Sequence, residues 1–143
     1  MESGLQGMIS SMLRTRWAYH VAAAVLTFIY WGSGIDKAID FTKAQSDMAR
    51  FGLNPAAAFG LATIAVQLGG SLLVILGGRL VWLGAGALAV FTLLTIPIAH
   101  RFWELTGEAA FHEKMVAFEH ITVIGGLMLV SIAAELGRHQ SKN

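Results

Sequence analysis

Ionisable and aromatic side chains gather in one stretch of the sequence, residues 99–126, where one long apolar run ends and the next begins. His100 stands three residues before Trp103, and Glu119 and His120 lie inside the following apolar run. An imidazole titrates near neutral pH, so His100 or His120 could donate to a ligand carbonyl or exchange its proton. The indole of Trp103 could flank a flat ring. Charged groups within apolar helices usually face a partner or a water-filled cavity, so a ligand site is expected here first.

Polar residues in two other apolar runs extend this prediction. Trp31 and Lys37 stand at the end of the first run, and Gln67 is the strongly polar group near the middle of the second. An unpaired ammonium at such a depth avoids a large free-energy cost only if its side chain extends to the interface. Lys37 is therefore predicted to have an acidic partner, which would be Asp36, Glu104 or Glu119.

These side chains together predict one polar ligand site in the outer half of a helical bundle. Its members are Trp31, Lys37, Gln67, His100, Trp103, Glu119 and His120. His120 is expected to point into the bundle, with Glu119 turned toward Lys37 or His100, because an unsatisfied polar group in hydrocarbon costs several kcal/mol. The alternative interpretation is a salt-bridge and hydrogen-bond cluster that only fixes helix packing. No catalytic residue is predicted.

A metal site is a weaker version of the same idea. His100 and Glu104 are of ligand type and four residues apart, but no pair of histidines has the HExxH spacing. No metal ligand is therefore predicted. The sequence contains no cysteine, which excludes thiolate metal sites, disulfides and thiol redox chemistry on this chain.

The composition indicates an integral membrane protein. Of 143 residues, 55% are hydrophobic and 13% are charged, whereas soluble domains carry about 25% charged residues. The formal net charge is +1, so nothing in it suggests nucleic acid binding. At this length we expect a single membrane domain, residues 1–143, with the lipid bilayer as its first partner.

Four apolar runs predict an all-α fold, a bundle of four transmembrane helices. Each is close to the roughly 20 residues that span hydrocarbon as a helix, and they cover residues 17–35, 56–76, 80–98 and 115–134. Helical spacing of apolar residues also predicts two short amphipathic helices at the membrane surface, within residues 5–13 and 38–54. Thr42 with Gln45 fits a capping box, and Asn54 is expected to cap the second span.

The orientation in the membrane follows from lysine and arginine, although the signal is small. Five of the ten basic residues fall on each side of the predicted spans. The side that carries the termini has the shorter loops and the higher positive density, which favours both termini in the cytoplasm. A cleavable signal peptide is the rival interpretation of the N-terminal run, but that run is longer than the usual apolar region of a signal.

In the order and spacing of its motifs, nearly the whole chain resembles the DoxX family of small bacterial membrane proteins. The matching pieces are Trp31-Gly32-Ser33-Gly34-Ile35-Asp36-Lys37, Phe41, Gly52-Leu53-Asn54-Pro55, Gln67-Leu68-Gly69-Gly70, Leu76-Gly77, His100-Arg101-Phe102-Trp103, Phe118 and Gly125-Gly126. The chain departs from the family pattern at Gln67, where glutamate is usual, and at Glu119-His120, where lysine-asparagine is usual. The resemblance implies a redox-associated component of the bacterial inner membrane.

Three functions are compatible with these features. The first is a quinone- or small-aromatic-binding component of a membrane oxidoreductase complex or of an oxidative-stress response, which needs a redox-enzyme partner because the chain alone has no redox centre. The second is a small transporter or permease, which with four helices needs a homo-oligomer. The third is a structural membrane partner of a soluble enzyme, favoured by the small residues that repeat along the second span.

Overall fold

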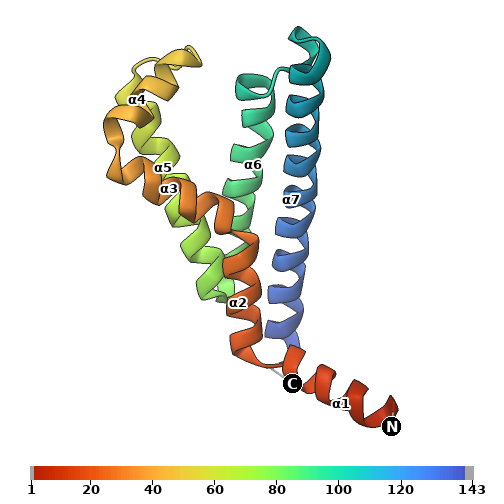
Figure 1. Ribbon diagram of the computed structural model, residues 1–143. Helices are drawn as coiled ribbons and strands as arrows, with labels where there is room; N and C mark the ends of the chain where they lie inside the picture. Colours follow the sequence, from red (N-terminus) through yellow and green to blue (C-terminus); the bar gives the residue numbers. More distant parts are fainter. Residues whose placement is uncertain (1, 141–143) are drawn as a thin grey trace.

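The computed structural model describes residues 2–140, and within them the chain is helical and contains no strand. The predicted all-α class is therefore confirmed. In chain order the helices are α1 (Glu2–Leu13), α2 (Arg16–Leu26), α3 (Phe28–Ile39), α4 (Phe41–Arg50), α5 (Ala56–Leu76), α6 (Val81–Ala99) and α7 (Gly107–Gln140), as Figure 1 shows. Two short 3-10 turns, η1 (Gly78–Leu80) and η2 (Phe102–Glu104), connect α5 to α6 and α6 to α7.

Three helical segments are long and apolar enough to cross a membrane. They are Ala56–Leu76, Gly78–Glu104 and Gly107–Gln140, and the bent pair α2–α3 makes a fourth if it is counted as one broken span. These segments indicate a multi-pass membrane protein. The four straight spans that the apolar runs predicted reduce to three.

The first predicted span, residues 17–35, is wrong as a single helix, because α2 and α3 meet at an angle of 60°. Thr27 stands at the break, and its hydroxyl donates to the carbonyl of Ala23 (2.7 Å). From beyond the break, the indole N–H of Trp31 donates to the carbonyl of Ala24 (3.0 Å). Side chains that satisfy freed backbone groups allow a membrane helix to bend. Hydropathy reports which residues are apolar, so it carried no sign of this bend.

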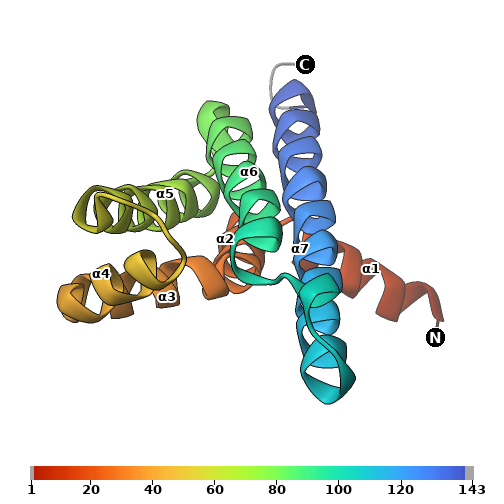
Figure 2. The same ribbon diagram turned by 90° about the horizontal axis from the view of Figure 1, so that it is seen from above.

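The helices form two groups that diverge toward one end of the molecule. The helices α3 and α4 lie along α5, while α6 and α7 run side by side (Figure 1). The view from above separates the same two groups (Figure 2). The diverging end carries α4 and η2, and the opposite end carries α1 and the C-terminal end of α7 (Figure 1). The predicted bundle of four transmembrane helices is therefore not confirmed.

The core lies where α2, α5, α6 and α7 come closest, and small residues allow the approach. A Cβ added to Gly84 of α6 would stand 2.7 Å from the carbonyl oxygen of Gly70 on α5. A Cβ on Gly126 of α7 would stand 2.7 Å from Leu26 of α2. Glycine at such points lets two membrane helices pack closely. The largest fully buried side chains around these crossings are Leu88, Leu127, Val74 and Val81.

Helix ends differ from the sequence prediction at two places. The N-cap of α4 is Asp40, whose carboxylate accepts from the backbone N–H of Lys43 (2.9 Å), so the capping box predicted at Thr42 is wrong. Pro55, and not Asn54, is the residue that precedes the first turn of α5. The amphipathic character of α4 is present, because Ala44 and Met48 are buried.

Helix α7 extends well beyond the predicted span, residues 115–134. Its 34 residues rise about 51 Å at 1.5 Å each, against a hydrocarbon core of about 30 Å. Helix α7 is therefore longer than the hydrocarbon core is thick.

Candidate functional site

The seven predicted site residues fall into two separate polar groups instead of one. His100 and His120 come together between α6 and α7, with Glu113. Lys37 and Gln67 come together between α3 and α5, around Ser33. The remaining three, Trp31, Trp103 and Glu119, join neither set of hydrogen bonds. The divergence of the two helix groups explains the separation, because the sequence predicted all seven residues in one helical bundle.

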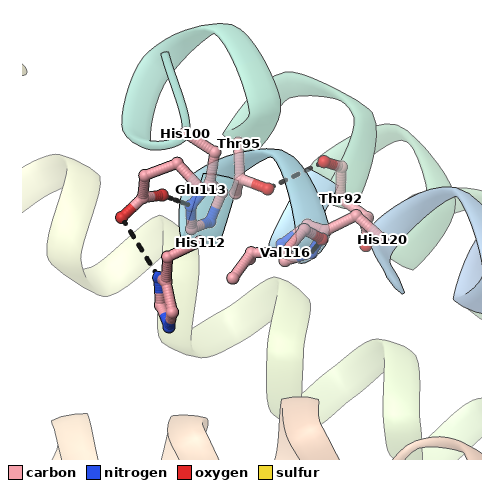
Figure 3. Close-up of polar contacts among 7 residues, drawn as sticks. All are labelled: Thr92, Thr95, His100, His112, Glu113, Val116 and His120. Atoms are coloured by element: carbon pink, nitrogen blue, oxygen red, sulfur yellow. Dashed lines mark hydrogen bonds and ion pairs between the residues drawn. The ribbon is translucent and has the colours of Figure 1, made fainter. Parts of the chain in front are cut away.

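The first group, here called the histidine cluster, consists of His100, Glu113 and His120. His100 is the C-cap of α6 and stands three residues after Pro97, which lies inside the helix. The chain then turns through η2 and returns along α7, which brings Glu113 back to the end of α6. His100 Nδ1 lies 2.7 Å from Glu113 Oε2, with the two side chains 22% and 29% exposed. Figure 3 shows Glu113 between His100 and the outlying His112.

His120 completes the histidine cluster from one side. Its Nδ1 lies 2.8 Å from the carbonyl oxygen of Val116, one turn earlier on α7. Its ring meets the ring of His100 edge to face, with 4.8 Å between centroids and 65° between planes. His120 is half-buried, and it faces the end of α6 as well as its own helix. Two imidazoles and one carboxylate thus share a partly exposed position at the end of two apolar helices.

The second group, here called the serine cluster, consists of Ser33, Lys37 and Gln67. The Ser33 hydroxyl oxygen accepts hydrogen bonds from Lys37 Nζ (2.6 Å) and from Gln67 Nε2 (3.4 Å). The acidic partner predicted for Lys37 is not found, because no ion pair of Lys37 occurs within residues 2–140. Gly34 makes the approach possible, since a Cβ there would stand 2.8 Å from Leu68 of α5.

Gln67 is the most buried of the predicted site residues, with 5% of its surface exposed. Its Oε1 is a buried acceptor that has no hydrogen-bond partner within the part of the chain that the structure describes. Buried polar groups are usually hydrogen-bonded. The serine cluster is therefore a half-satisfied polar contact inside an otherwise apolar helix crossing.

Three predicted residues have other positions. Trp31 binds the Ala24 carbonyl across the α2–α3 break and packs edge to face on Phe28 (4.9 Å between centroids). Trp103 is 55% exposed and packs on Phe102 in the η2 turn (5.1 Å). Glu119 is exposed on α7 and makes no ion pair within residues 2–140, so it does not reach Lys37 or His100 as expected. These three do not converge on a common point.

Two residues of the clusters were missed as site members, Glu113 and Ser33. Glu113 could have been found from the turn between the two spans, because the end of one helix and the start of the next must be neighbours. Glu104, which stands four residues after His100, pairs with Arg101 in η2 (3.5 Å). Ser33 lies one helical turn before Lys37, a spacing that places both on one face. Within residues 2–140, no three His, Asp or Glu side chains are placed to hold a metal ion.

Comparison with known proteins gives one match. A model of the DoxX family matches residues 18–101, which run from α2 to the end of α6. No curated protein and no solved structure matches the chain. The matched region contains the whole serine cluster and His100, whereas Glu113 and His120 follow it on α7.

Proposed function

The chain belongs to the DoxX family, and from this premise we propose that it is a membrane component that binds a quinone or a related small aromatic molecule for an oxidoreductase partner. The observation that carries the proposal is the histidine cluster. His100 is held by Glu113 at 2.7 Å and faced by His120. Imidazole is the side chain that exchanges protons near neutral pH.

The position of the histidine cluster suits an apolar molecule that gains or loses protons. Three apolar helices provide the lipid-side approach, and the partial exposure of His100 and Glu113 provides the route to water. Phe102 and Trp103 stand in the adjoining η2 turn, where their rings could cover a flat ligand. Such a site combines a mostly apolar setting with a few polar groups that orient the ligand.

The proposal assigns electron transfer to a partner protein. The chain carries no cysteine, and its histidine cluster offers hydrogen bonds and proton exchange. We place the protein in the bacterial inner membrane with both termini in the cytoplasm. The histidine cluster then belongs to the opposite, outer side, because η2 and α1 lie at opposite ends of the molecule (Figure 1).

Ligand-induced stabilisation tests the proposal. The protein is placed in lipid nanodiscs, and its thermal unfolding is followed with and without a short-chain benzoquinone or its hydroquinone. At about ten times the dissociation constant, binding should raise the Tm by about 3–6 °C. The matched variants are His100→Ala and His112→Ala, because His112 is a neighbouring histidine that is largely exposed and lies 3.9 Å from Glu113.

The wild-type protein and His112→Ala should both show the rise in Tm, and His100→Ala should lose most of it. Quenching of Trp103 fluorescence by the quinone gives an independent reading, with Trp103→Phe as its control. A wild-type protein that shows neither stabilisation nor quenching would refute the proposal. Equal stabilisation of wild type and His100→Ala would show that the histidine cluster does not bind the ligand.

A further inference from the structure

The hydrogen bonds of the histidine cluster fix which ring nitrogens carry protons. A backbone carbonyl can only accept, so His120 Nδ1 must donate to Val116 O, which lies 2.8 Å away. A carboxylate also only accepts, so His100 Nδ1 must donate to Glu113 Oε2 at 2.7 Å. A neutral imidazole has one N–H and one lone pair. In its neutral form, each ring therefore presents Nε2 as a bare acceptor.

This assignment decides which ligand groups the cluster can bind. A quinone offers carbonyl oxygens, which are acceptors and cannot bond to a bare Nε2. A hydroquinone or a catechol offers hydroxyls, which donate. From the two Nδ1 contacts we infer that the histidine cluster selects the reduced, hydroxyl-bearing form of its aromatic ligand, with a ligand O–H donating to Nε2 of His100. The inference rests on the proposed function and adds the chemical form of the ligand.

Glu113 acts here as a positioning residue. By accepting from Nδ1 it holds the ring orientation of His100 and keeps the lone pair on Nε2. A chain of hydrogen bonds from the ligand hydroxyl through the imidazole to the carboxylate is also mutually polarised, which strengthens each bond. The selection concerns binding alone, and the ligand keeps its proton. The ring of His120 offers a second lone pair, and its centroid lies 4.8 Å from that of the His100 ring.

The test compares the two redox forms of one probe. A short-chain benzoquinone and its hydroquinone are titrated anaerobically into the protein in nanodiscs, with wild type, Glu113→Ala and His112→Ala side by side. One neutral hydrogen bond gained by the reduced form predicts about tenfold tighter binding of the hydroquinone to wild type. His112→Ala should keep this ratio. Glu113→Ala frees His100 to carry its proton on Nε2, so its ratio should fall toward one.

A second measurement needs no variant. In protein labelled with nitrogen-15 at histidine, the side-chain shifts of His100 and His120 near neutral pH should report a protonated Nδ1 and an unprotonated Nε2. Equal binding of both redox forms to wild type, or a protonated Nε2 on His100, would overturn the inference and leave the proposed function standing. Failure of both forms to bind would overturn the two together.

Discussion

The Tyr30 hydroxyl ties α3 to α6 within the core. It is hydrogen-bonded to Thr92 Oγ1, and both side chains are buried. The Thr92 hydroxyl already donates to the carbonyl of Leu88 (2.7 Å), so Tyr30 must be the donor of the pair. Replacing Tyr30 by Phe removes this bond at nearly constant volume, and we expect the free energy of unfolding to fall by about 1 kcal/mol.

A double-mutant cycle measures this bond directly. Thr92→Val should also destabilise, because it leaves the Tyr30 hydroxyl unsatisfied, and the double variant should lose less than the sum of the two. Thr122→Val is the matched control, since the exposed Thr122 bonds only within its own helix. Strict additivity of Tyr30→Phe and Thr92→Val would show that the hydroxyls do not interact.

Gln67 supports a prediction of the opposite sign. Its Oε1 is buried without a partner in the described residues, which costs about 1–3 kcal/mol. Gln67→Leu should therefore leave the stability of the detergent-purified protein unchanged or raise it by about 1 kcal/mol, as measured by thermal unfolding. A clear loss of stability would mean that Oε1 has a partner in solution.

The sequence predicted more of the histidine cluster than of the other site residues. His100 and His120 were expected near each other because the end of one span and the start of the next lie at one membrane depth. Their partner Glu113 depends on the path of the η2 turn, which residue spacing does not determine. Glu119 was misplaced because the argument allowed it only an inward face, whereas it is exposed on α7.

Among the helices, α5 and α6 approach each other closely at Gly84. In Gly84→Ala the new Cβ would stand 2.7 Å from both the Gly70 carbonyl oxygen and Leu73 Cβ, so the helices must move apart. We expect a loss of about 1–3 kcal/mol in the free energy of unfolding. Gly86→Ala is the control on the same helix, because open space surrounds Gly86 and alanine favours helix by up to about 1 kcal/mol. Equal effects of the two substitutions would contradict the crossing.

Helix positions were more predictable than helix lengths and shapes. Apolar runs located α5 and α6 to within one residue, because hydrocarbon requires about 20 apolar residues in a row. The same criterion predicted too short a helix for α7, because the ends of α7 are polar. It also missed the break at Thr27. Both features depend on hydrogen bonds and helix propensity, which hydropathy does not measure.

For the whole molecule, the structure predicts which surface positions share a side of the membrane. The chain has no cysteine, so single cysteines can be introduced at exposed residues and labelled with an impermeant maleimide. Ser10→Cys and Gln140→Cys should label from one side, and Thr42→Cys and Thr106→Cys from the other, since the ends they occupy are opposite (Figure 1). Labelling of Ser10→Cys and Thr42→Cys from the same side would show that α2–α3 enters and leaves without crossing.

The fold class and the membrane character followed from composition, but the arrangement of the helices did not. Glycine positions indicated close packing without saying which helices meet, and the two diverging groups separate residues that the sequence placed in one site. The central claim that remains to be tested is that the histidine cluster binds a quinone-type molecule.

Extraction of bound ligand tests this claim most directly. The protein is purified from its own membrane in mild detergent, extracted into organic solvent and examined by mass spectrometry for quinones and hydroquinones. Wild type and His112→Ala should carry such a molecule in near-stoichiometric amount, and His100→Ala and His120→Ala should carry much less. Repeated absence of any quinone-type molecule from wild type, or equal amounts in all four proteins, would contradict the account.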